Sequence, residues 1–105
     1  MPEPEEYQVI VSKRATQQLV ELAAFNAQLD EKLAYKLIEE FRSAADSLKM
    51  FPFRNPVLRS EVFTVEKYRK MLFGKWNLLI YQIKGNTVYV EYVIDARSDY
   101  QWLIK

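Results

Sequence analysis

The feature that most constrains the fold of this 105-residue sequence is a run of apolar residues at three- and four-residue steps between Asp30 and Pro52. Its members are Ala34, Leu37, Ile38, Phe41, Ala45 and Leu48. Charged and polar side chains fill the positions between them, which predicts an amphipathic helix with one buried face. Asp30 suits the N-cap of this helix, and Pro52 and Pro56 prevent its continuation. The segment therefore needs another apolar surface to pack against.

A second helix is predicted from Lys13 to about Ala27, with Ser12 as its N-cap. The apolar stripe of this segment consists of Ala15, Leu19, Leu22 and Ala23, widened by Val20, Ala24 and Ala27. Because the break between Asn26 and Asp30 is short, the two helices should form an antiparallel hairpin.

Four segments are typical of β-strands: Tyr7–Val11, Tyr68–Phe73, Trp76–Ile83 and Thr87–Ile94. Gly74-Lys75 and Gly85-Asn86 separate the last three and favour tight hairpins, so these strands should form an antiparallel meander that the first strand joins. The expected fold is α+β with the order β-α-α-β-β-β, in which the helical hairpin packs on one face of a small, mainly antiparallel sheet. We expect a flexible tail at residues 1–6 and a single domain at residues 7–105.

The composition excludes several kinds of chemistry. The sequence has no cysteine and no histidine, so disulfides, thiolate metal sites and imidazole bases are absent, and any catalysis must use carboxylates, Tyr, Lys or Arg. With only two glycines there is no phosphate-binding loop, and no carboxylate spacing suggests a metal site. We expect neither a cofactor nor a metal. No segment approaches the roughly 20 apolar residues of a membrane span, and the acidic start is unlike a secretory signal, so a cytoplasmic protein is expected.

Charge is unevenly distributed along the chain. Residues 1–50 carry six Lys/Arg against nine Asp/Glu, a net charge of −3, whereas residues 51–105 carry nine against five, a net charge of +4. A local basic patch of this kind can bind an anion such as RNA phosphate, or it can simply keep a sheet soluble.

Five motifs at the joints of the predicted elements narrow the fold further. They are Ser12-x-x-Ala15-x-x-x-Leu19, Leu48-x-x-Phe51-Pro52, Tyr68-Arg69, the run from Asn77 to Tyr81, and the run from Val88 to Tyr100. Taken in this order, from about Tyr7 to Tyr100, they resemble the RelE/ParE superfamily, the toxins of bacterial type II toxin–antitoxin pairs. The resemblance implies a compact growth inhibitor, associated with plasmid stabilisation, that a cognate antitoxin holds inactive.

The resemblance leaves the activity open between two branches. RelE-like members cut mRNA in the ribosomal A site, whereas ParE-like members are taken to inhibit DNA gyrase without hydrolytic chemistry. Asp95 stands where RNA-cleaving relatives have a histidine, and Ala96 replaces an arginine of the pattern. These departures favour the ParE-like branch, with a ribosome-dependent mRNA endonuclease and a degenerate, non-toxic binding module as alternatives. Whether the chain is an enzyme stays open.

The resemblance also implies candidate site residues. In a RelE-like enzyme Arg69, Arg97 and Tyr100 would be catalytic, with Arg69 on the uncovered side of the sheet. Each also has a structural explanation, as a solvated arginine on an open face or as part of a tail that packs on the sheet edge. A second set would guide rRNA and mRNA phosphates, unless it is only a solvated surface; it consists of Arg59, Lys67 and Lys70.

A four-stranded sheet covered on one side leaves its other face and an edge for a partner. Tyr81, Tyr89 and Trp76 are more aromatic surface than a small domain readily hides, so we expect them at this partner site. The expected partner is a partly disordered antitoxin segment that folds as a helix or an added strand. The target would be DNA gyrase or the ribosome with its mRNA, and a homodimer or a heterotetramer with the antitoxin is compatible with the sequence.

Overall fold

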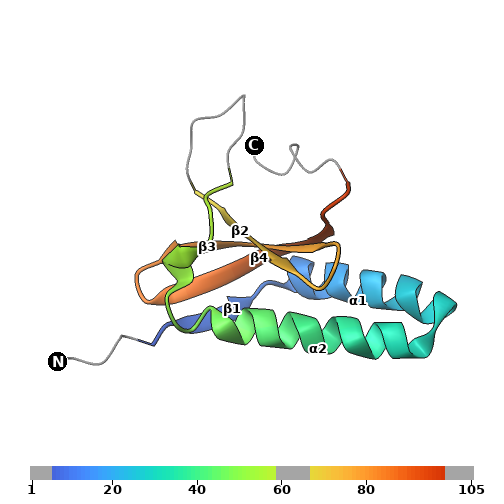
Figure 1. The fold of residues 1–105 in the computed structure, drawn as a ribbon. Coiled ribbons are helices and arrows are strands. Elements are labelled where there is room, and N and C mark those ends of the chain that lie inside the picture. The colour runs from blue at the N-terminus through green and yellow to red at the C-terminus, as the bar shows by residue number, and fades with distance from the viewer. Residues whose placement is uncertain (1–5, 59–66, 99–105) are drawn as a thin grey trace.

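The structure, a computed structural model, describes residues 6–58 and 67–98. Its elements follow the predicted order: β1 (Gln8–Val11), α1 (Lys13–Leu29), α2 (Glu31–Ser47), a 3-10 turn η1 (Pro52–Arg54), β2 (Arg69–Phe73), β3 (Asn77–Lys84) and β4 (Thr87–Asp95). Figure 1 shows the paired helices on one face of the sheet. The predicted α+β fold is therefore confirmed. Of the predicted tail at residues 1–6, all but Glu6 lies outside the described residues.

Both predicted N-caps are present. The Ser12 hydroxyl accepts a hydrogen bond from the Ala15 backbone N–H at 3.0 Å, and the Asp30 carboxylate accepts one from Lys32 at 3.0 Å. Asp30 has extended backbone angles, and it is both the C-cap of α1 and the N-cap of α2. Because this single residue joins the helices, they are held as a tight antiparallel hairpin. α1 continues to Leu29, two residues beyond its predicted end.

The four strands lie in the order β1-β4-β3-β2. β1 runs parallel to β4, and the other two pairs are antiparallel. The turns β2–β3 and β3–β4 contain Gly74 and Gly85, whose φ angles of +59° and +58° are readily adopted only by glycine. The meander predicted from these two glycines is confirmed.

Beyond the end of β1, residues at the start of α1 provide hydrogen-bond partners for the edge of β4. β1 covers this edge only as far as Val90. Beyond it the Ser12 hydroxyl donates a hydrogen bond to the Glu91 carbonyl at 3.2 Å, and the Val93 N–H donates one to the Gln18 side-chain oxygen at 2.9 Å. These bonds satisfy backbone groups of β4 that have no strand partner beyond the end of β1.

The main core lies between the helices and the sheet. Large or fully enclosed members include Leu37, Phe41, Leu48, Phe73, Leu79, Tyr81, Val88, Val90 and Val93. A smaller cluster on the opposite face of the sheet joins Leu58, Ile80 and Tyr92, with Tyr68 and Ile94 packed against it. The sheet is therefore apolar on both faces.

The expected position of Arg69 on the uncovered side of the sheet is wrong. Side chains alternate along a strand, so Arg69 shares a face with Met71 and Phe73, both of which belong to the helix-side core. Lys70 and Leu72 point to the other face. Arg69 is half-buried beyond the end of α2, beside η1, rather than under the helices.

The expected exposure of aromatic residues is confirmed only in part. Trp76 is 48% exposed, but Tyr81 is fully buried and Tyr89 is half-buried. The Tyr81 hydroxyl donates to the Pro52 carbonyl and accepts from the Asn55 amide at 3.1 Å, which accounts for a buried phenol in the core.

Within residues 6–58 and 67–98, no helix has the length and apolar character that crossing a membrane requires. The same residues contain no cluster of three or more metal-ligating side chains.

Candidate functional site

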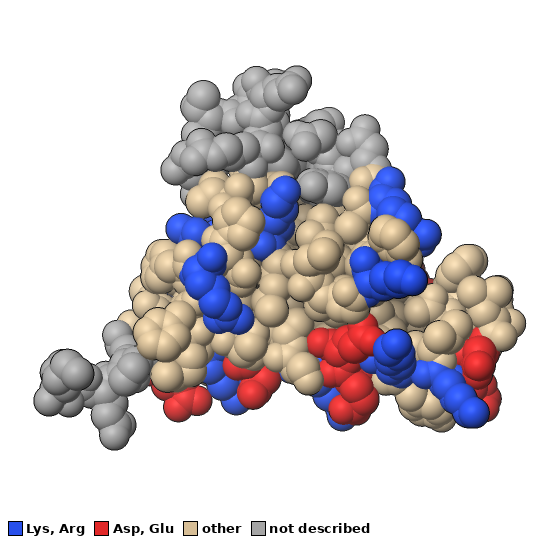
Figure 2. Space-filling view, viewed as in Figure 1, with Lys and Arg blue, Asp and Glu red and all other residues tan. Residues whose placement is uncertain are grey.

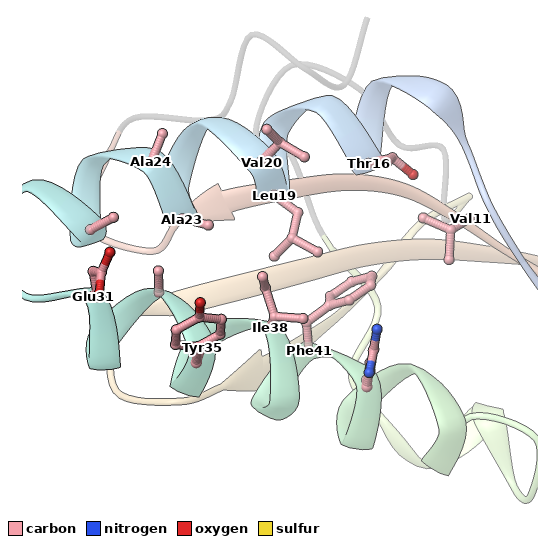
Figure 3. A pocket seen from close by; sticks show the side chains of 13 residues that line it. Val11, Thr16, Leu19, Val20, Ala23, Ala24, Glu31, Tyr35, Ile38 and Phe41 are labelled. Atoms are coloured by element: carbon pink, nitrogen blue, oxygen red, sulfur yellow. The ribbon is translucent and has the colours of Figure 1, made fainter.

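A hollow of about 560 Å³ runs between α1 and α2. In Figure 3, Leu19 and Ala23 of α1 and Ile38 and Phe41 of α2 point toward one another across it. Part of its lining consists of alanines, whose small side chains leave the space open; they are Ala23, Ala24, Ala27 and Ala34. At its rim Val20 is 60% exposed and Tyr35 is 69% exposed. An open apolar hollow of this kind is typical of a partner site.

The hollow continues to the edge of the sheet. A second hollow of about 530 Å³ lies between β1 and α2 and shares Val11, Phe41 and Arg42 with the first. Among the described strands, β1 is paired only on its β4 side, so its outer edge offers backbone N–H and C=O groups. We call the two hollows together with this edge the helix groove. It can take a helical segment between α1 and α2 and an extended segment beside β1.

Arg69 is held by backbone carbonyls. Its guanidinium donates hydrogen bonds to the carbonyls of Asn55, at 2.7 Å, and Phe53, at 3.1 Å, and lies 5.2 Å from the centre of the Phe53 ring. Its neighbour in register is the buried Tyr81. Burial raises the pKa of the Tyr81 hydroxyl, which remains neutral. Through these hydrogen bonds, Arg69 holds η1 against the start of β2.

Arg97 is held by a carboxylate two residues away. Its Nε and Nη2 atoms lie 3.0 and 2.8 Å from the two carboxylate oxygens of Asp95, a bidentate pair. The hydrogen bond from the Arg97 side chain lowers the pKa of the Asp95 carboxyl below its ordinary value. The Asp95 carboxylate is therefore ionised at neutral pH and bound to Arg97.

The structure does not bring the predicted catalytic residues together. Arg69 pairs with Tyr81, in the middle of β3, whereas Asp95, two residues before Arg97, pairs with Asn77 at the start of β3. These two positions are about 13 Å apart along the strand. Tyr100 lies outside the described residues. In this arrangement Arg69 and Arg97 do not converge on one phosphate-binding position.

Two of the three predicted binding residues, Lys67 and Lys70, lie just before β2 and on it. Lys67 is exposed, with its amino group 5.1 Å from the Tyr68 ring, and Lys70 is half-buried on β2. Arg59 lies outside the described residues. Figure 2 shows mainly Lys and Arg over the strands and Asp and Glu gathered below, along the helices. The expected charge asymmetry is thus present in space, while the roles of these residues stay predictions.

The part of the helix groove that lies between α1 and α2 was not among the sequence-based predictions, which placed the partner on the open face and an open edge of the sheet. A signal for it was present in the first helix. Val20, Ala24 and Ala27 widen the apolar stripe beyond what one buried face needs. A stripe too wide for the core indicates a second surface to cover.

A helical hairpin on a β1-β4-β3-β2 sheet is the arrangement of the RelE/ParE-like toxins. The sequence model of the ParE toxin of type II toxin–antitoxin systems, parDE, matches residues 9–100. This span includes nearly every described element, and the chain belongs to the ParE toxin family of type II toxin–antitoxin systems.

A solved structure supports the same fold. The protein described as the chromosomal ParDE TA system from P. aeruginosa superposes with a TM-score of 0.74, over 89% of this chain and 99% of that chain, at 14% sequence identity. No curated protein matches the sequence. The resemblance to the RelE/ParE superfamily is confirmed, as is the prediction of a type II toxin.

Proposed function

We propose that this ParE-family toxin inhibits DNA gyrase through protein contacts, in the cytoplasm, and that a cognate antitoxin neutralises it by occupying the helix groove. The observation that carries the antitoxin site is the continuous apolar track from the helical hairpin to the outer edge of β1. It fits one amphipathic helix followed by one extended strand, the two structures that a disordered segment adopts on binding.

The arrangement of the arginines supports inhibition by contact over RNA cleavage. A ribonuclease needs cationic groups converging on one phosphate as the 2′-oxygen attacks. Arg69 is instead bound to two carbonyls, and Arg97 is bound to Asp95. The negative charge of Asp95 at this position also opposes a phosphate.

Two assays on purified protein test the target. We expect the toxin to block supercoiling by gyrase and to leave mRNA intact on programmed ribosomes. Cleavage of that mRNA, abolished by Arg69→Ala, would instead establish the RelE-like endonuclease. If expression without an antitoxin leaves growth unchanged, the chain is a non-toxic binding module.

A charge placed in the helix groove tests the antitoxin site. Val20 is exposed, so Val20→Glu should fold normally while placing a carboxylate in the apolar track. We expect at least a tenfold loss of antitoxin affinity with gyrase inhibition retained. Gln17→Glu is the matched control, since Gln17 is exposed on the same helix and does not line the hollow. Equal antitoxin affinity for both variants would contradict the assignment.

A further inference from the structure

A separate hollow of about 360 Å³ lies between the helical hairpin and the β2–β3 turn. We call it the hairpin-end hollow. In Figure 1 the β2–β3 turn lies over the helices, whose connection projects beyond the end of the sheet. The apolar part of its lining is Leu22, Phe25, Leu33, Leu37 and Trp76. The polar rim is formed by Lys36, Glu40, Lys75, Asp95 and Arg97, with two asparagines.

Large apolar side chains are exposed around this hollow. Phe25 is 63% exposed and Trp76 is 48% exposed, and the neighbouring Leu29 and Leu33 are also exposed. Exposed aromatic residues of this size are uncommon on a surface that meets only water, and they often carry most of the binding energy of an interface.

Trp76 is held in place before any partner arrives. Its carbonyl accepts a hydrogen bond from the Ala96 N–H at 2.6 Å, which fixes the turn to the end of β4. The guanidinium of Arg97 lies 5.2 Å from the centre of the Trp76 ring, and the amino group of Lys75 lies 5.9 Å from it. Because Asp95 already orients Arg97, this surface loses little conformational freedom on binding.

The charge of the rim indicates what the hollow would accept. Three cations and two carboxylates border it, a net charge of +1. Glu40 lies 3.8 Å from the Lys36 amino group, and Asp95 is bound to Arg97. An apolar side chain beside a carboxylate complements this arrangement, since it fills the apolar floor and meets the cationic excess. A nucleic-acid phosphate is less suited, because two carboxylates border the same hollow.

The hairpin-end hollow is distinct from the helix groove. The two share no lining residue. On each helix their residues are offset by well over a quarter turn, at about 100° per residue, so they open on different sides of the hairpin. A segment bound in one hollow leaves the side chains of the other in place.

We propose that the toxin binds its target protein through the hairpin-end hollow. The hollow receives an apolar side chain of the target, and a carboxylate of the target next to it meets the cationic rim. This inference rests on the proposed function, in which the toxin acts by protein contact. It separates the two activities of the chain: the target binds at the hairpin end, and the antitoxin binds in the helix groove.

Two substitutions test the hollow, each with a matched control. Trp76→Ala removes the aromatic platform, and Lys75→Glu reverses a rim charge. The controls are Tyr89→Ala and Lys84→Glu, because Lys84 and Tyr89 form a cation–aromatic pair with the same 5.9 Å separation, outside this hollow. We expect the first pair to weaken gyrase binding and inhibition at least tenfold, with antitoxin binding unchanged, and the controls to match the wild type.

Each outcome decides the proposal. Wild-type inhibition by both Trp76→Ala and Lys75→Glu would overturn it, and so would single-stranded DNA binding by the toxin that these substitutions abolish, since the occupant would then be nucleic acid. If the wild type arrests growth without inhibiting gyrase, the proposed target is wrong. In that case loss of growth arrest in the two variants alone supports the hollow as the target site, and retained arrest overturns it. Antitoxin binding reports that each variant is folded.

Discussion

At the scale of single residues, the ion pair between Asp95 and Arg97 decides the chemistry at the end of β4. Both side chains are partly exposed, so the pair adds little to global stability. Its effect is local: it keeps a carboxylate ionised and fixes the guanidinium against Trp76. This end of the sheet consequently presents an ionised carboxylate bound to a guanidinium that is fixed in place.

The lowered pKa of Asp95 can be measured directly. The group loses its proton more readily in the folded state, so its contribution to stability is present above the unfolded pKa, about 3.9. That contribution is lost as the pH falls through the lower folded value. A carboxyl-carbon NMR titration should give a midpoint for Asp95 below the ordinary pKa of an aspartate. Arg97→Ala should raise this midpoint, and an unchanged midpoint would mean that the pair does not form in solution.

Arg69 is predicted to stabilise the fold rather than to catalyse. Arg69→Ala removes two hydrogen bonds to carbonyls and the contact with Phe53, and should lower the free energy of unfolding by about 1–3 kcal/mol in urea denaturation. Gyrase inhibition per folded molecule should be retained. Normal stability together with lost activity would show instead that Arg69 contacts the target.

At the scale of elements, the sequence predicted the helices, strands and turns well, because these depend on residues that are close together in the chain. The caps at Ser12 and Asp30, the helical period and the two glycine turns were all identifiable because each acts within a few residues. The side of the sheet on which Arg69 lies was not, since it depends on which face the helices cover. The acceptors of Arg69 come from Phe53 and Asn55, in an irregular segment that carries no period.

The candidate site was less predictable than the fold. The sequence indicated that the chain has a partner but placed the surface on the sheet, because Tyr81 was counted as exposed. Its burial depends on η1 reaching over the end of the core, where the Pro52 carbonyl accepts the phenol hydrogen. A contact between segments this far apart leaves no mark in local spacing.

The two turn glycines should differ in their tolerance of alanine. Both have positive φ angles, so either substitution costs about 1–2 kcal/mol of strain. A β-carbon on Gly74 would also overlap the Glu40 carboxylate, whereas one on Gly85 meets no atom within 4 Å. The Glu40 carboxylate is the end of a flexible side chain and can move aside at the cost of its weak ion pair with Lys36. Gly74→Ala should therefore destabilise the protein by only about 0.3–0.5 kcal/mol more than Gly85→Ala in thermal unfolding. Adding Glu40→Ala should remove this difference, and equal losses without it would contradict the close approach.

At the scale of the whole molecule, the core is closed on the helix side, and two partner sites lie outside it, the helix groove and the hairpin-end hollow. The helices serve both purposes, since one face of each packs on the sheet and another remains available to a partner. This arrangement explains why the apolar stripes are wider than a two-layer domain requires.

Antitoxin binding should raise the stability of the toxin by mass action. A ligand that binds only the folded state adds about 2.7 kcal/mol at a concentration of 100 times its Kd. The melting temperature should rise with antitoxin concentration for the wild type and for Gln17→Glu. For Val20→Glu, a tenfold loss of affinity should reduce this gain to about 1.4 kcal/mol at the same antitoxin concentration. An equal rise in all three proteins would place the antitoxin elsewhere.

The parallel pairing of β1 with β4 has a consequence for synthesis. Gln8 through Val11 find their strand partners only when Thr87 through Val90 have been made, after both helices and most of the meander. A contact of such long sequence separation forms late and slows folding. A ribosome that stops before Thr87 therefore releases a chain lacking the strand beside β1, so premature termination should yield a harmless fragment instead of a partly active poison.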